Sequence, residues 1–231
     1  MSNRLEKSQF HRFLDEAGDT TFYGKGRVPI LGREGVSNYF LLGMLTINES
    51  LSVVRNKIIE LQDFIIKDPY LINVPSIHKS RKNVGYFLHA KNDIPEVRKL
   101  AFELIKSIDC KFDIVVGKKD YNIYEIKHNG SQAEFYADML SHLLLTSISS
   151  YDKLVLNIAS RSLCTTHFNL ERGLQKAILI SKYKNPTLND NCEIKFNVQM
   201  PIIEPLLNIA DYFLGQCKGK LSEMKKGFLS L

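Results

Sequence analysis

The sequence has few cysteines, and they form no recognisable metal-binding or redox pair. The four cysteines, at positions 110, 164, 192 and 217, are scattered and include no Cys-x-x-Cys motif. This argues against a zinc ribbon or a thioredoxin-like centre, because both hold two thiols a short, fixed distance apart. Isolated thiols are typical of a reducing cytoplasm, and a chain of 231 residues buries enough surface to fold without disulfide bonds.

Long apolar runs and several common catalytic motifs are also missing. No stretch approaches the roughly 18 apolar residues that span a bilayer, and the N-terminal segment MSNRLEKSQ lacks the apolar core of a signal peptide. We therefore expect a cytoplasmic protein with no membrane partner. Because the Gly-x-x-x-x-Gly-Lys, Gly-x-Gly-x-x-Gly and Gly-x-Ser-x-Gly patterns are absent, nucleotide cofactors and serine hydrolase chemistry are not indicated.

The composition is that of an ordinary globular protein with a modest excess of basic residues. Hydrophobic residues make up 44% and charged residues 24% of the chain, which argues against disorder along its whole length. The 31 Lys and Arg residues against 25 Asp and Glu residues give a net charge of +6. This excess weakly favours a polyanionic partner such as a nucleic acid, although it also serves solubility alone.

Apolar periodicity predicts a single α/β domain over residues 1–231, since no linker, repeat or low-complexity tract divides the chain. The early strands follow one another, as in an antiparallel sheet, whereas the later strands alternate with helices, as in parallel crossovers. We therefore expect a mixed sheet flanked by helices, with the basic residues 78–82 in a loop and Asp93 as a helix N-cap. The expected strands are 10–14, 20–23, 38–47, 111–117, 153–158 and 193–198, and the expected helices are 51–66, 94–108, 131–148, about 170–178 and 205–216.

Residues 13–20 (FLDEAGDT) carry three acidic side chains within five residues, where the first expected strand ends. Asp15, Glu16 and Asp19 repel one another at neutral pH, so the arrangement is costly unless a cation neutralises it. Hard cations such as Mg²⁺ and Mn²⁺ prefer oxygen ligands of this kind, and Gly18 would allow a sharp turn beside them. The alternative is a polar β-turn in which Asp and Gly serve the turn alone.

A second acidic segment lies late in the chain, in residues 204–212 (EPLLNIADY). Pro205 is suited to begin a helix, and Glu204 and Asp211 are seven residues apart, which would bring both to one helix face. An acid on the core-facing side of a helix needs a metal, an arginine or a hydrogen bond to offset its burial. Alternatively, Asp211 faces solvent and Glu204 only favours the helix N-terminus.

Together, the early DEAGD segment and the late IADY segment resemble the ribonuclease H-like proteins catalogued as domain of unknown function 3800. The resemblance includes an LHA segment at residues 88–90 and extends over about residues 10–218. It implies a ribonuclease H-like fold with an acidic, metal-binding centre, in which Asp15 on the first strand and Asp211 on a C-terminal helix hold metal. Such enzymes usually use two Mg²⁺ ions to clamp the attacking and leaving oxygens of a phosphodiester.

The same resemblance implies the other acidic site residues. Glu16 and Asp19 would be further metal ligands or would support the ligands. Apart from the resemblance, we keep Glu204 as a reserve candidate. The fold normally supplies one more acid from a middle strand, but here the strand 153–158 runs into the sequence ASR. Asp120, which follows the strand 111–117, is a reserve candidate for that position.

Three basic positions are candidates for binding nucleic-acid phosphates. His89 belongs to the LHA segment, and Lys119 and Arg161 each follow an expected strand. A histidine can bind phosphate or act as a general acid, and a lysine or arginine can neutralise phosphate charge. Each also has a structural interpretation, as a hydrogen-bonded histidine or as a solvated loop charge.

From these observations we predict a Mg²⁺- or Mn²⁺-dependent phosphodiester hydrolase that acts on RNA or DNA. The absence of a middle-strand acid keeps a second hypothesis open. In that case the chain is an inactive ribonuclease H-like module that binds nucleic acid or protein, for example in a defence or mobile-element complex. A smaller phosphorylated substrate is a third alternative.

Overall fold

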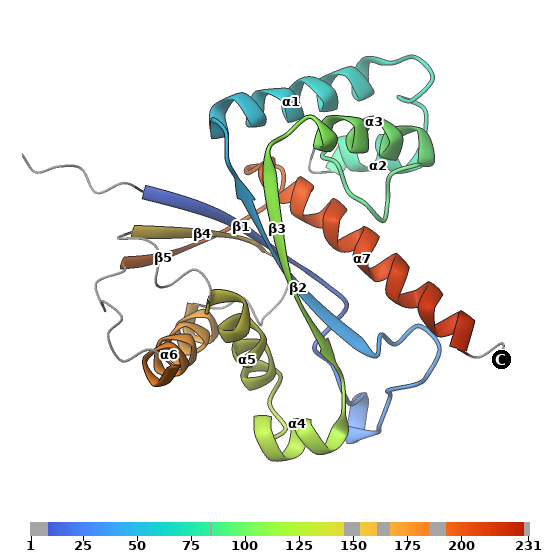
Figure 1. Ribbon diagram of the computed structural model, residues 1–231. Helices are drawn as coiled ribbons and strands as arrows, with labels where there is room; N and C mark the ends of the chain where they lie inside the picture. Colours follow the sequence, from blue (N-terminus) through green and yellow to red (C-terminus); the bar gives the residue numbers. More distant parts are fainter. Residues whose placement is uncertain (1–8, 84, 146–152, 161–166, 185–192, 229–231) are drawn as a thin grey trace, which may run out of the picture.

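The computed structural model has a five-stranded mixed sheet with helices on both faces (Figure 1). It describes residues 9–83, 85–145, 153–160, 167–184 and 193–228. The strands lie in the order β3-β2-β1-β4-β5. They are β1 (Gln9–Ala17), β2 (Tyr39–Ile47), β3 (Cys110–Lys118), β4 (Lys153–Ala159) and β5 (Glu193–Gln199).

The pairing of the strands confirms the expected change from an antiparallel to a parallel arrangement. β1 pairs antiparallel with β2, and β2 pairs antiparallel with β3. β4 instead lies parallel to β1, and β5 lies parallel to β4. The carboxyl ends of β1, β4 and β5 therefore meet at one edge of the sheet.

The helices form two groups, one on each face of the sheet. α1 to α3 and α7 cover one face, and α4 to α6 cover the other (Figure 1). α7 packs across β1 and β2. The helices are α1 (Leu51–Lys67), α2 (Pro75–Asn83), α3 (Pro95–Lys106), α4 (Tyr121–His128), α5 (Gln132–Leu144), α6 (His167–Lys184) and α7 (Leu206–Phe228).

The first two acids of the early motif lie inside β1, because this strand continues to Ala17 rather than ending before Asp15. Phe13 belongs to the core under α7, whereas Leu14 belongs to the core under α5 and α6. Since successive side chains of a strand alternate between faces, Asp15 faces α7 and Glu16 faces the opposite side. Both are buried, at 2% and 8% exposure.

Gly43 of β2 lies opposite Asp15 in the strand register, and it leaves space for an aromatic stack that joins the sheet to α7. The Phe112 ring from β3 occupies the position that a Cβ at residue 43 would take. Phe112 in turn stacks on Phe213 of α7, with ring centroids 4.8 Å apart. The stack therefore holds α7 against the sheet near the strand position of Asp15.

The substitution Gly43→Ala is expected to lower the free energy of unfolding by about 1–3 kcal/mol, because the added methyl overlaps the Phe112 ring and forces it aside. Urea unfolding measures the change. Gly219→Ala is the control, because a Cβ at this α7 position meets nothing within 4 Å and alanine favours a helix. A Gly43→Ala protein as stable as the parent would contradict this packing.

Three local predictions were wrong. Residues 78–82 lie in helix α2, which begins at Pro75. This helix buries Ile77 among many polar residues, so its apolar periodicity is weak. The expected strand at 20–23 is instead an irregular segment with one bridge, Tyr23 to Pro29. The N-cap of α3 is Ile94 rather than Asp93. Helix α4 was not predicted, since it is short and leaves its isoleucines exposed.

Two further expectations concern thiols and membranes. Cys110 and Cys217 carry free thiols, and the other two cysteines lie outside the described residues. In the part of the chain that the structure describes, we find no helix with the length and apolarity that crossing a bilayer requires.

Candidate functional site

A cavity of about 890 Å³ lies beside the carboxyl end of β1. Four elements line it: the end of β1 with Gly18, the segment 89–91, one face of α3, and the middle of α7. The cavity therefore collects side chains from four distant parts of the sequence. Asp211 and His89 are among its lining residues.

Asp211 is held at the wall of this cavity by the LHA segment. Its Oδ2 accepts a hydrogen bond from the backbone N–H of Ala90 at 2.7 Å. His89 Nδ1 lies 3.5 Å from the same oxygen, but it accepts a hydrogen bond from the N–H of Lys91 at 3.1 Å. Nδ1 is therefore an acceptor in this arrangement, and the backbone amide of residue 90 helps to orient the Asp211 carboxylate.

Asp15 lies on the same side of the sheet as this cavity. Ala17 lines the cavity, and Asp15 comes two residues earlier on the same face of β1. The repeat of a β-strand sets it about 7 Å further along the strand. Asp15 of the early motif and Asp211 of the late motif thus share the face of the sheet that α7 covers.

A buried carboxylate fixes the LHA segment against α7. Asp93 Oδ2 accepts hydrogen bonds from the Tyr212 hydroxyl and from the His89 N–H, both at 2.7 Å. Asp93 Oδ1 accepts a hydrogen bond from the Tyr86 hydroxyl at 3.2 Å. Burial raises the pKa of both tyrosines, so both stay protonated and act as donors. Asp93 therefore positions residues 89 and 90, which in turn orient Asp211.

The substitution Asp93→Ala is expected to lower the free energy of unfolding by about 2–5 kcal/mol, because buried hydroxyl and amide donors lose their acceptor. Urea unfolding near neutral pH measures this loss. Asp93→Asn is the matched control, since its amide keeps one oxygen acceptor and is expected to cost less. Equal stability of the Asp93→Ala protein and the parent would show that this network is unimportant.

The stability of the parent relative to Asp93→Asn should also depend on pH. Burial raises the pKa of the Asp93 carboxyl above its ordinary value, although its three donors oppose the shift. The folded state therefore binds the Asp93 proton more tightly than the unfolded state does. The stability that this proton contributes is largest below the ordinary pKa of an aspartate, and it is lost as the pH rises through the raised pKa of the folded state. We expect the parent to gain stability relative to Asp93→Asn as the pH falls from about 7 toward 4.

Asn208 is a residue of this region whose role the sequence analysis missed. It lies in α7, three residues before Asp211, and is 1% exposed. Neither atom of its side-chain amide has a hydrogen-bond partner among the described residues. A buried amide of this kind costs about 1–3 kcal/mol unless something binds it, and an amide oxygen is a ligand that hard cations accept. The Asn-x-x-Asp spacing on one helix face was the available signal.

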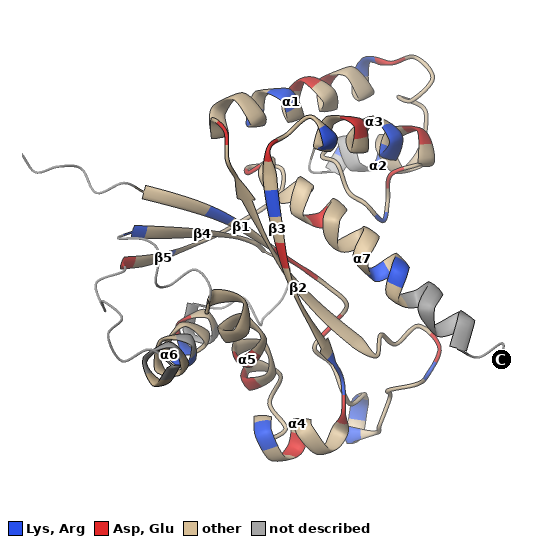
Figure 2. Ribbon diagram, viewed as in Figure 1, with Lys and Arg blue, Asp and Glu red and all other residues tan. Residues whose placement is uncertain are grey.

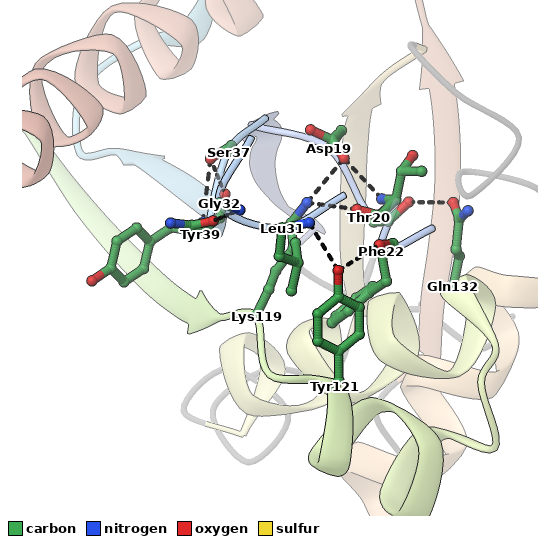
Figure 3. Close-up of polar contacts among 12 residues, drawn as sticks. Asp19, Thr20, Phe22, Leu31, Gly32, Ser37, Tyr39, Lys119, Tyr121 and Gln132 are labelled. Atoms are coloured by element: carbon green, nitrogen blue, oxygen red, sulfur yellow. Dashed lines mark hydrogen bonds and ion pairs between the residues drawn. The ribbon is translucent and has the colours of Figure 1, made fainter. Parts of the chain in front are cut away.

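Asp19 and Lys119 form an ion pair with each other (Figure 3). Asp19 Oδ1 accepts hydrogen bonds from Lys119 Nζ and from the Thr21 N–H, both at 2.9 Å. The Lys119 side chain is 0% exposed, and its Nζ also donates to the Thr21 carbonyl. Burial lowers the pKa of Lys119, and the Asp19 charge opposes that shift. This pair braces the β1–β2 connection against the end of β3, so we leave both residues out of the proposed site.

Two other acids have structural partners elsewhere. Glu204 precedes α7 rather than lying within it, so it does not share a helix face with Asp211 as predicted. Its carboxylate pairs with the guanidinium of Arg55 in α1, through contacts of 2.9 Å from Nε and 2.7 Å from a terminal nitrogen. Asp120 is the N-cap of α4 and accepts a hydrogen bond from the Ile123 N–H. Arg161 lies outside the described residues.

The donor set for a metal is small. Within the described ranges, no three His, Cys, Asp or Glu side chains gather closely enough to hold an ion. A metal at this site would therefore depend on fewer carboxylates, supplemented by an amide oxygen such as that of Asn208 or by water. No protein-family model matches the chain, and no curated protein matches it.

Proposed function

We propose that this protein is a Mg²⁺- or Mn²⁺-dependent phosphodiester hydrolase that acts on RNA or DNA, with a ribonuclease H-like fold. The main support is that Asp15 in the central strand β1 and Asp211 in α7 share one face of the sheet, and that Asp211 lines a large cavity at the end of β1. A mixed sheet with one acid on the first strand and another on a C-terminal helix fits the resemblance to the domain of unknown function 3800 proteins.

The residues at this site are compatible with a hard cation. Asp15 and Asp211 would supply carboxylate oxygens, and the buried Asn208 amide, which lacks a partner among the described residues, would supply a neutral oxygen. When bound, the ion would supply an activated water and charge stabilisation at the leaving oxygen. The Ala90 N–H keeps the Asp211 carboxylate oriented, and Asp93 holds that segment in place.

A second candidate, an inactive module that binds nucleic acid, has its own support. The described residues contain no group of three or more metal-binding side chains. Two of the acids expected at the site, Asp19 and Glu204, are instead paired with Lys119 and Arg55. A chain of this kind would bind nucleic acid with strong salt dependence and without cleavage.

One assay separates the two candidates. Labelled single-stranded and double-stranded RNA and DNA are incubated with the protein in Mg²⁺, in Mn²⁺ or in EDTA. The hydrolase proposal expects shortened products that require the metal. Intact substrate under every condition, together with salt-sensitive binding that the metal does not alter, would favour the inactive module.

A further inference from the structure

Most of the charged residues that line the cavity beside Asp211 are cations. Of the described residues at its wall, Asp211 carries the negative charge, whereas Lys91, Arg98 and Lys218 carry three positive charges. Lys91 directly follows the LHA segment, Arg98 lies in α3 and Lys218 lies in α7. Figure 2 shows that an acidic position on α7 is followed, toward the C-terminus, by a basic stretch. A cavity with this balance attracts an anionic group.

Arg98 is the cation that is best prepared to bind an anion. Its Nε is buried and has no hydrogen-bond partner among the described residues. One terminal nitrogen donates a long hydrogen bond, 3.4 Å, to the Lys91 carbonyl, and none of the described ion pairs gives the guanidinium a carboxylate. Because a guanidinium presents its N–H groups as a planar fork, it matches the oxygens of a phosphate in a bidentate contact.

An aromatic wall lies next to this cation. Phe102 also lines the cavity and follows Arg98 by one helical turn, so both face the same way on α3. Its ring meets the Tyr212 ring edge-on, with centroids 5.3 Å apart, which holds it in place. Exposed aromatic rings beside a basic surface bind unpaired bases by stacking.

We propose that the cavity binds one nucleoside monophosphate unit, with its phosphate at Arg98 and its base against Phe102. This inference rests on the proposed function, because it takes the bound unit to be part of the phosphodiester substrate next to Asp211. The cavity volume of about 890 Å³ is in the range of sites that hold small molecules. Since a base inside a duplex is stacked and paired, the substrate is a single strand.

The test is a binding measurement in EDTA, so that no cleavage is needed. Fluorescence anisotropy follows a labelled single-stranded 10-mer, with AMP, inorganic phosphate and a 10-base-pair duplex as competitors. Arg98→Gln is expected to raise the Kd about tenfold or more, because a hydrogen bond to a charged group is lost. Arg33→Gln is the matched control, since it removes the same charge from an exposed position in the β1–β2 connection and should change the Kd less than about twofold.

The competitors show whether the site binds a free mononucleotide or a nucleotide within a strand. If AMP competes at concentrations near the Kd of the labelled 10-mer, the ligand is a free mononucleotide. If AMP competes only at much higher concentrations, the ligand is a nucleic-acid strand. Phe102→Leu should reduce the preference for AMP over inorganic phosphate, since leucine keeps the bulk but cannot stack. Equal effects of Arg98→Gln and Arg33→Gln, or equal affinity for duplex and single strand, would overturn the inference.

The same experiment separates this inference from the proposed function. Arg98-dependent binding without metal-dependent cleavage would contradict the hydrolase and leave the nucleotide site standing. Conversely, an active nuclease whose single-strand affinity does not depend on Arg98 would contradict the nucleotide site alone.

Discussion

Replacing Asp15 with asparagine is expected to reduce metal-dependent cleavage by at least about a thousandfold. A metal ligand contributes several kcal/mol to stabilising charge in the transition state, and each 1.36 kcal/mol is a factor of ten in rate. Asparagine keeps the size of the side chain and its acceptor for the Glu16 N–H, which lies 2.8 Å from Asp15 Oδ1. The measurement is the rate of substrate cleavage in excess Mg²⁺.

Stability in metal-free buffer shows whether this loss is specific. The thermal midpoint of Asp15→Asn should equal or exceed that of the parent, because an ionised carboxylate at 2% exposure is costly to bury. Asp113→Asn makes the same chemical change in β3, where Asp113 pairs with the exposed Lys111, and should leave cleavage intact. Parental cleavage rates in Asp15→Asn would refute the catalytic assignment.

The substitution Asp211→Asn is expected to abolish stabilisation by Mn²⁺. At a metal concentration 100 times Kd, an ion that binds only the folded state adds about 2.7 kcal/mol. In a chain of this size, that raises the thermal midpoint of the parent by about 5–10 °C. Asparagine preserves the oxygen that accepts the Ala90 N–H, so the variant should fold normally and show no comparable shift.

The control for Asp211→Asn is Asp63→Asn. Asp63 is an exposed acid in α1 that pairs with Lys67 one turn away, so its loss should leave the Mn²⁺ shift unchanged. If Asp211→Asn and the parent show the same shift, the ion binds elsewhere. If the parent shows none at any Mn²⁺ concentration, the inactive binding module becomes the better account.

Much of the sheet could be predicted from the sequence because its strands carry strong local patterns. β2 and β4 are nearly continuous apolar runs, and their order among the helices indicates which neighbours are parallel. The failures are segments whose conformation depends on tertiary contacts. Residues 20–23 read as a strand, but Phe22 instead anchors an irregular segment in the core by stacking on Tyr124.

The site could be predicted only in part, because residue types do not reveal their partners. The DEAGD motif indicates a cluster of three acids, yet strand alternation sends Glu16 to the far face. Asp19 is neutralised by Lys119, which lies 100 residues away, and Glu204 by Arg55, which lies 149 residues away. No local pattern encodes such pairs. The resemblance to domain of unknown function 3800 therefore stays a prediction, supported by the positions of Asp15 and Asp211.

A crystal structure of the parent protein soaked in Mn²⁺ tests the central claim most directly. Anomalous scattering locates the ion without assumptions about its ligands. We predict a peak with carboxylate oxygens of both Asp15 and Asp211 at about 2.0–2.6 Å. A peak that touches only one of these acids, or a fully occupied Mn²⁺ site elsewhere on the molecule, would contradict the account.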